Sequence, residues 1–240
     1  WPYNLSFTLN HYTYGFEEAG VENAYRNSLT MAAWCAVVGA LLTFAGAYWL
    51  EKTRGADLVR PIVRLQAMLP MAIPGLVLGI GYILFFNHPA NPLNVLYGTM
   101  GILVLSTIVH FYSSSHLTAV TALKQLDNEF ESVSASLKVP FYKTFWRVTV
   151  PVCLPSIIDI SRYYFVNAMT TISAVVFLYS PKTMLAAISI VQLDEAGAIG
   201  SAAAMATLIV VTSGIVTLLS FAVEGWLLRC TQGWRRAAPT

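Results

Sequence analysis

The sequence predicts an all-α integral membrane protein with five transmembrane helices. Of its 240 residues, 56% are hydrophobic and only 11% are charged, and the mean hydropathy is +0.61. Soluble domains carry about 25% charged residues. The apolar runs are long and continuous and lack the alternation of barrel strands, so helices are expected to span the membrane. The net charge of +2 is too small to indicate a nucleic-acid partner.

The spans can be counted from uncharged runs, because a helix needs about 20 apolar residues to cross a bilayer core. Residues 27–50 and 65–123 contain no Asp, Glu, Lys or Arg. The second run is too long for one span, and Asn87–Asn94 (NHPANPLN) divides it because Pro and Asn favour turns. Two further apolar runs follow. We therefore expect spans at 28–50, 65–86, 97–122, 155–178 and 199–227.

The basic residues predict the orientation. Eleven of the 14 follow span one, three or five; they are Lys52, Arg54, Arg60, Arg64, Lys124, Lys138, Lys143, Arg147, Arg229, Arg235 and Arg236. Cytoplasmic loops carry such an excess, so the N-terminal segment is expected outside and the C-terminus in the cytoplasm. The expected organisation is an external segment at 1–25, a transmembrane domain at 26–236 with a long cytoplasmic loop at about 127–150, and a tail at 237–240.

No pattern in the sequence suggests an enzyme. The four histidines lack metal-ligand spacing, and no nucleophile–base arrangement is visible, so neither a catalytic residue nor a metal is expected. The phosphate-binding pattern GxxxxGK[ST] is also missing, so no cofactor is expected and ATP hydrolysis would need another protein.

The loop between spans three and four is longer than a turn requires. It has helical apolar spacing before Pro140 and again after it, with basic and aromatic residues interleaved. This predicts a short helix, a bend and a second short helix, after which Pro151 begins the next span. The loop could lie on anionic lipid, or it could dock a cytoplasmic protein. The residues alone favour neither.

The stretch Glu131–Pro155 (ESVSASLKVPFYKTFWRVTVPVCLP) resembles the coupling loop of binding-protein-dependent ABC importer permeases. Glu131 stands at the acidic start of that motif, but Lys138 replaces its usual Gly. YRNSLTMAA and LPMAIPGLVLGIGY are similar to the family's first core spans. EKTRG and FVNAMTTISAVVFLYS are most similar to 2-aminoethylphosphonate permeases. Related ferric-iron permeases, which are often two fused halves, share the architecture.

This resemblance implies a five-helix permease core in the inner membrane. The implied partners are cytoplasmic ABC ATPase subunits, a second permease half or subunit, a periplasmic substrate-binding protein and the lipid bilayer. The implied activity is import of a small anionic nutrient, 2-aminoethylphosphonate, with ferric iron or another small solute as the alternative. A membrane anchor is the alternative from another class. The implied ATPase-coupling residues are Glu131, Leu137, Lys138, Phe141, Phe145 and Arg147.

Two further groups within the spans are candidate sites. Gly75 and Gly79 form a GxxxG pattern, which predicts a helix-packing face or a part of the pathway. Ionisable groups are costly in hydrocarbon and usually pair or face an interior, so Asp159 and Arg162 are either a local ion pair or substrate contacts. The candidate pathway residues are Asp159, Arg162, Asn167, Thr170, Thr171 and Ser173.

Overall fold

The computed structural model describes residues 9–12, 21–52, 58–126 and 129–231, and these form helices joined by turns. The helices are α2 (Val21–Trp34), α3 (Ala40–Lys52), α4 (Val59–Ala72), α5 (Gly75–Phe86), α6 (Met100–Lys124), α7 (Glu129–Ser136), α8 (Phe141–Thr144), α9 (Val150–Thr170), α10 (Ala186–Glu195) and α11 (Ile199–Thr231). No strand occurs within these residues, so the all-α expectation is confirmed.

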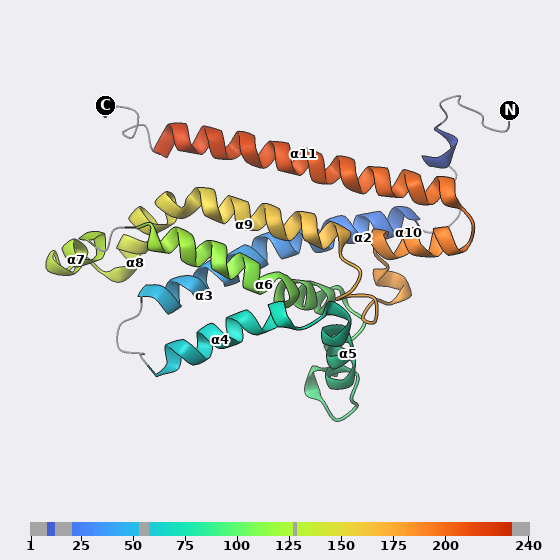
Figure 1. Ribbon diagram of the computed structural model, residues 1–240, viewed down its shortest axis with the longest axis horizontal. Helices are drawn as coiled ribbons and strands as arrows, with labels where there is room; N and C mark the ends of the chain where they lie inside the picture. The colour runs from blue at the N-terminus through green and yellow to red at the C-terminus, as the bar shows by residue number, and fades with distance from the viewer. Residues whose placement is uncertain (1–8, 13–20, 53–57, 127–128, 232–240) are drawn as a thin grey trace.

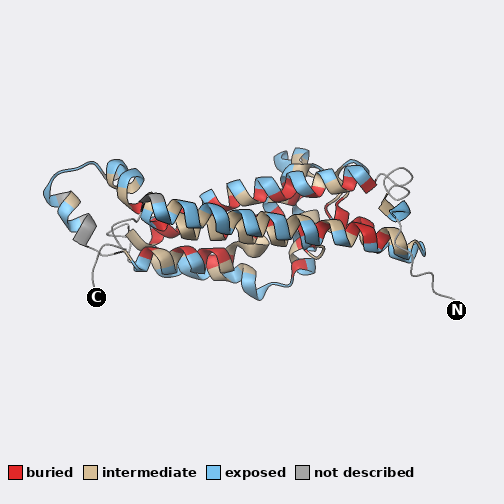
Figure 2. Cartoon of the chain, turned by 90° about the horizontal axis from the view of Figure 1, so that it is seen from above, coloured by how far each residue is buried: buried red, intermediate tan, exposed pale blue. Residues whose placement is uncertain are grey.

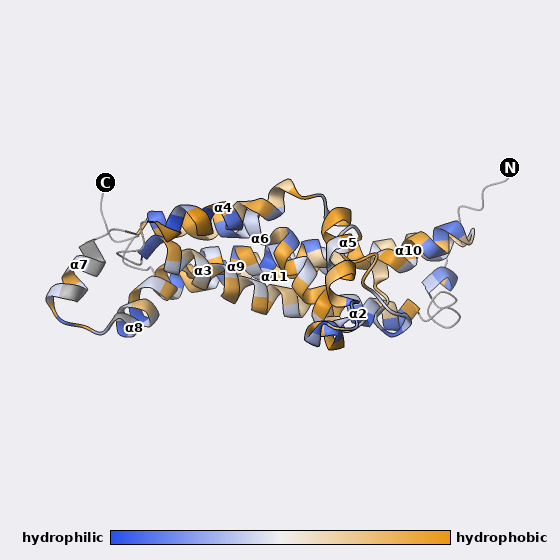
Figure 3. Cartoon of the chain, turned by 90° about the horizontal axis from the view of Figure 1, so that it is seen from below, coloured by the Kyte–Doolittle hydropathy of each residue, from blue (hydrophilic) through white to orange (hydrophobic). Residues whose placement is uncertain are grey.

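The long helices lie side by side along one axis (Figure 1). In the middle, α6 packs against α3, α4 and α9, and α9 also contacts α2 and α11. Helix α11 forms an outer layer, and Figure 2 shows it pale blue and tan over most of its length. Hydrophilic segments gather at the two ends of the long axis in Figure 3. This distribution is the one expected for a bundle that crosses a bilayer.

The observed helices fall close to the five expected spans, with differences in length and shape. By length and hydropathy, Val21–Lys52 and Ile199–Arg229 each suffice to cross a membrane, and the bent pair α4–α5 is a third candidate. Helices α6 and α9 are 25 and 21 residues long but carry more polar side chains and do not meet the same criterion. The first helical run is continuous because a π-helical turn, Cys35–Gly39, joins α2 to α3.

The expected second span, 65–86, is broken. The axes of α4 and α5 differ by 109°, and the turn lies at Ile73–Pro74. Ile73 is extended, with φ −99° and ψ 121°, because proline disfavours helix in the residue before it. Pro74 then caps α5 at a position where its missing N–H costs little. Helix α5 therefore leaves the bundle almost at a right angle (Figure 1).

The fourth span differs at both ends from the expected 155–178. Helix α9 ends at Thr170, and the apolar segment 171–180 forms turns instead. At the other end, α8, a π-helical turn (Phe145–Thr149) and α9 follow one another without a break. The Val150 N–H bonds to the Phe145 carbonyl, five residues back. Pro151 therefore lies inside a longer helical run, and the second half of the loop is continuous with the span.

The core is held by close helix packing around Tyr164, which is fully buried. A Cβ atom added at Gly39 would lie 2.9 Å from the Tyr164 ring, so only glycine lets the π-helical turn approach it. The Tyr164 hydroxyl lies 2.9 Å from Thr43 Oγ1, which provides its polar partner in an apolar interior.

Some expectations concern residues that the structure does not describe. The first described long helix begins at Val21, within the segment expected to be external, and most of the rest of 1–25 lies outside the described residues. The same holds for the tail at 237–240 and for three of the basic residues, Arg54, Arg235 and Arg236.

Candidate functional site: the loop between α6 and α9

The bend after α7 is a helix cap built around Lys138. Lys138 has φ +52°, the left-handed conformation that normally favours glycine. The Val139 N–H donates to the Ser134 carbonyl at 3.0 Å, and the Leu137 N–H donates to the Val133 carbonyl at 2.9 Å. This six-to-one bond across a left-handed residue is the pattern of a Schellman cap. The chain therefore makes with lysine the turn for which the resembling motif uses glycine.

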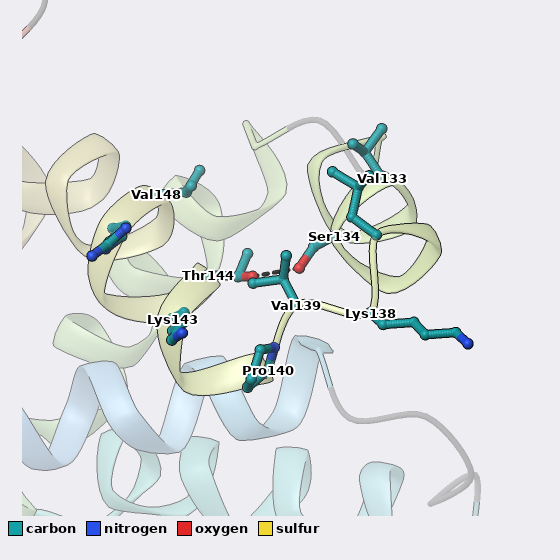
Figure 4. A pocket seen from close by; sticks show the side chains of 10 residues that line it. Val133, Ser134, Lys138, Val139, Pro140, Lys143, Thr144 and Val148 are labelled. Atoms are coloured by element: carbon teal, nitrogen blue, oxygen red, sulfur yellow. Dashed lines mark hydrogen bonds between the residues drawn. The ribbon is translucent and has the colours of Figure 1, made fainter.

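A groove lies between α7 and the helical run that begins at α8. Its volume is about 730 Å³. The side chains that line it, most of them labelled in Figure 4, are Val133, Ser134, Leu137, Lys138, Val139, Pro140, Lys143, Thr144, Arg147 and Val148. The hydroxyls of Ser134 and Thr144 hydrogen-bond across it, which fixes the two walls relative to each other. We call this surface the coupling groove.

The coupling groove combines apolar walls with positive charge. Val133 and Leu137 are 55% and 70% exposed, so they offer apolar surface to a partner. Lys138, Lys143 and Arg147 are also exposed, and the Lys138 side chain extends away from the other labelled side chains in Figure 4. Large hydrophobic side chains exposed beside charges are typical of a surface that another protein covers.

Phe145 lies on the opposite side of the same helical run. Its ring contacts that of Tyr48 edge to face, with a centroid distance of 4.7 Å, and lies 6.3 Å from that of Phe44. It therefore packs on α3 and does not line the coupling groove. The α7 and α8 backbones include Glu131 and Phe141, but these side chains lie outside what the structure describes. Leu137, Lys138 and Arg147 do line the groove.

Asp159 and Arg162 form the ion pair that the sequence offered as one of two possibilities. Arg162 Nη2 lies 2.6 Å from Asp159 Oδ1, and the guanidinium lies 4.4 Å from the centre of the Phe221 ring on α11. A cation over an aromatic face is attracted to it. Nη1 of Arg162 is buried and has no hydrogen-bond partner within the described residues. The pair thus leaves one donor available.

Two of the other candidate pathway residues form hydrogen bonds within their own helix. The Asn167 amide donates to the Tyr163 carbonyl and the Thr170 hydroxyl to the Val166 carbonyl, so both bond to their own helix. Thr171 is buried where α9 ends.

The Gly75–Gly79 face packs against the chain itself. A Cβ atom added at Gly75 would lie 2.9 Å from Ser173 Cβ and 3.1 Å from His110 Cε1. One added at Gly79 would lie 3.4 Å from the Phe177 ring. The GxxxG face of α5 is therefore covered by the segment after α9, which supports the packing interpretation. It also brings Ser173 and His110 together at the start of α5.

Several groove residues were not expected from the sequence. Val133 and Lys143 were recognised as parts of amphipathic runs, but their place in one groove depends on the Lys138 bend. The contact between Ser134 and Thr144 joins residues ten positions apart across that bend, and only the two small hydroxyls in the sequence hint at it. Among the described residues, no three His, Cys, Asp or Glu side chains lie close enough to hold a metal ion.

Known proteins resemble the chain along most of its length. A ferric transport system permease protein, FbpB of Actinobacillus pleuropneumoniae, is 30% identical over 91% of this chain and 31% of that protein. The chain thus spans less than a third of this relative. A putative 2-aminoethylphosphonate transport system permease protein, PhnV of Salmonella choleraesuis, is 24% identical over 92% of this chain and 81% of that protein. Both substrate classes considered above are represented.

The fold also resembles that of solved structures. A chain in the crystal structure of a bacterial alginate ABC transporter, in complex with an alginate pentasaccharide-bound periplasmic protein, superposes with a TM-score of 0.76. The two chains are 16% identical, and the match covers 89% of this chain and 81% of that one. The sequence profile of the binding-protein-dependent transport system inner membrane components matches residues 43–225. Because this match covers well over half of the sequence, the chain belongs to that family of membrane components.

Proposed function

We propose that the chain is a permease subunit of an ATP-driven importer and that its coupling groove receives a cytoplasmic ATPase. The observation that carries the proposal is the groove itself, with exposed Leu137 and Val133 beside three cations at a fixed bend. An apolar helix of an ATPase with an acidic edge would complement it. The chain has no phosphate-binding loop of its own, so the partner supplies hydrolysis.

The remaining partners follow from the family. A binding-protein-dependent system takes its substrate from a binding protein, and the alginate transporter was crystallised with such a periplasmic protein. A second permease half or subunit would complete the pathway. Exposed apolar side chains along α11, such as Val210 and Leu218 at 69% and 70%, leave room for lipid or that second half.

For the substrate we propose a small anion, 2-aminoethylphosphonate. The chain resembles permeases of that class along most of its length. Arg162 also holds a buried donor without a partner among the described residues, and a guanidinium is well suited to phosphonate oxygens. Ferric iron is the second candidate, because FbpB shares more identical residues with the chain. Uptake of each compound by cells that lack other transporters for it decides between them.

The groove proposal is tested by truncating Leu137, an apolar side chain that is largely exposed and makes few contacts within the permease. Leu137→Ala should lower co-purification of the ATPase and substrate uptake together. A buried interface anchor contributes about 2 kcal/mol, which corresponds to about 30-fold in affinity. Trp146→Ala, a similarly exposed side chain on the opposite side of the helix, is the matched control and should retain the ATPase.

The two variants also show whether the ATPase docks on the coupling groove or elsewhere. Normal ATPase retention and uptake in Leu137→Ala would show that the coupling groove is not the docking surface. Phe145→Ala is a poorer test, because its ring packs on Tyr48; we expect it to lower the thermal stability of the permease itself.

The orientation is tested by cysteine labelling. The ends of α3 and α11 and the loop helices α7 and α8 lie at one end of the bundle (Figure 1), and the basic excess marks that end as cytoplasmic. An impermeant thiol reagent added to intact cells should label Asn91→Cys and leave Lys143→Cys unlabelled. Labelling of the second position and not the first would reverse the topology.

A further inference from the structure

The elbow that joins α4 to α5, residues 71–77, lies halfway along the bundle. The Met71 N–H donates to the Ser113 hydroxyl at 3.2 Å, and a Cβ atom added at Gly75 would lie 3.1 Å from His110 Cε1. Ser113 and His110 are both near the middle of α6, which is 25 residues long. Such a helix extends about 38 Å, and the hydrocarbon core of a bilayer is about 30 Å thick, so the elbow lies within the depth of the core.

The backbone of the elbow has polar groups without partners. Within the described residues, the carbonyls of Met71 and Ala72 accept no hydrogen bond, and the N–H groups of Leu76 and Val77 donate none. Residues 71–74 are all exposed, so the rest of the chain does not cover them. Irregular backbone at this depth occurs only where protein buries it or where it lines a water-filled cavity. Lipid is therefore excluded as the neighbour of the elbow.

The side chains around the elbow are apolar. We call six of them the elbow face; they are Leu69, Met71, Ile73, Leu76, Val77 and Ile80, and they are 37–70% exposed. Contact between water and so much apolar surface is unfavourable, which argues against a water-filled cavity here. A helix of another protein suits both features, because it can pack on the apolar side chains and exclude lipid from the backbone.

Helix α11 makes no such demand, although it also exposes apolar side chains. It is an unbroken helix from Ile199 to Thr231, so its backbone groups are paired within the helix and lipid can cover side chains such as Val210. The chain thus has two apolar surfaces of different kinds. The regular one is compatible with lipid, and the broken one requires protein.

The shape of the elbow indicates which protein. The axes of α4 and α5 differ by 109°, and α5 projects from the side of the bundle away from α11 (Figure 1). One surface therefore holds both a projecting helix and a corner that receives one, as a twofold contact between identical chains requires. We propose that the elbow face binds a second copy of this chain, with α5 of each copy packed into the elbow of the other. The inference rests on the proposed function for the second permease subunit and adds the surface through which that subunit binds.

The test counts subunits in phosphatidylcholine vesicles that contain the full chain alone. Each chain carries one fluorophore, and the photobleaching steps of single complexes are counted over a range of protein densities. The unmodified chain should be dimeric except at the lowest densities. Val77→Trp adds a bulky ring to the elbow face and should raise the dissociation constant of the dimer about tenfold. Val210→Trp makes the same change on an exposed position of α11 and should leave that constant unchanged.

Three results of the counting experiment would overturn the proposal. Monomers of the unmodified chain at every density would mean that a different protein covers the elbow. Unchanged dimers in Val77→Trp would mean that the copies meet elsewhere. Equal loss of dimers in the two tryptophan variants would indicate non-specific adhesion.

A second measurement does not depend on the folding of Val77→Trp. Met71→Cys in the dimer should react with a water-soluble thiol reagent much more slowly than Ala90→Cys, which lies in the exposed turn after α5; mass spectrometry of each peptide gives the rates. Equal rates would show that water lines the elbow and would also overturn the proposal. No ATPase or substrate is present in either measurement, so a negative result would leave the coupling groove to its own test with Leu137→Ala.

Discussion

Replacing Lys138 by glycine should stabilise the bend of the coupling groove, although glycine usually destabilises helical segments. A non-glycine residue at φ +52° is strained by about 1–2 kcal/mol, and glycine removes that strain at an entropic cost of about 0.5–1 kcal/mol. The net gain is about 0.5 kcal/mol, or roughly twofold in the equilibrium of local opening. Lys138→Val should cost about 1 kcal/mol or more, because a β-branched residue tolerates this conformation least.

The Val139 amide reports on the bend directly, because its bond to the Ser134 carbonyl exists only while Lys138 is left-handed. Hydrogen exchange of peptides that cover this amide should slow about twofold in Lys138→Gly and accelerate about fivefold or more in Lys138→Val. Lys143→Gly is the matched control. Lys143 lies in the helical run, where a glycine lowers helix stability by about 1 kcal/mol. Hydrogen exchange of the amides around position 143 should therefore accelerate in Lys143→Gly. The same direction of change in both glycine variants would refute the reasoning.

Two further predictions concern packing inside the bundle. Gly75→Ala should lower the free energy of unfolding by about 1–3 kcal/mol, because its methyl group would clash with Ser173. Gly81→Ala is the control and should not lower it, because no atom lies within 4 Å of the added Cβ. Equal melting temperatures of the two variants in detergent would contradict this prediction. Tyr164→Phe and Thr43→Val should each cost about 1 kcal/mol for their shared hydrogen bond. The double variant should cost clearly less than the sum, and strict additivity would mean that the bond contributes nothing.

The sequence is sufficient for the order of the long helical segments because hydrocarbon requires long, uncharged helical runs. It is not sufficient for the number of helices, since the expected second span is two helices, α4 and α5, and α10 was not expected. Nor is it sufficient for the helix ends. An apolar run is compatible with a helix or with a buried turn, so the passage from α9 into the turns after Thr170 is not visible in hydropathy. In those turns the Ala174 carbonyl accepts a hydrogen bond from the Ser106 hydroxyl. Ser106 lies on α6, so this partner is brought near only by the fold.

The site was predictable to a similar degree. Pro140 and the periodicity around it indicate two short helices and a bend. They do not indicate which face of the second helix is free, because Phe145 has the same apolar character whether it packs on α3 or on a partner. The sign of a left-handed conformation at Lys138 is the glycine that the resembling motif has at this position, because lysine itself does not favour that conformation.

The unbroken helical run from Phe141 to Thr170 has a mechanical consequence. Its 30 residues extend about 45 Å, so a rigid tilt of about 5° at one end would displace the other by about 4 Å. This one rigid helical run therefore connects the loop, at one end, with the turns that hold Ser173 against α5, at the other. Its weakest section is the π-helical turn beside Pro151, where the regular hydrogen bonding changes. If the proposed partner displaces the coupling groove, the bending stiffness of that single turn sets how much of the displacement is transmitted to the far end.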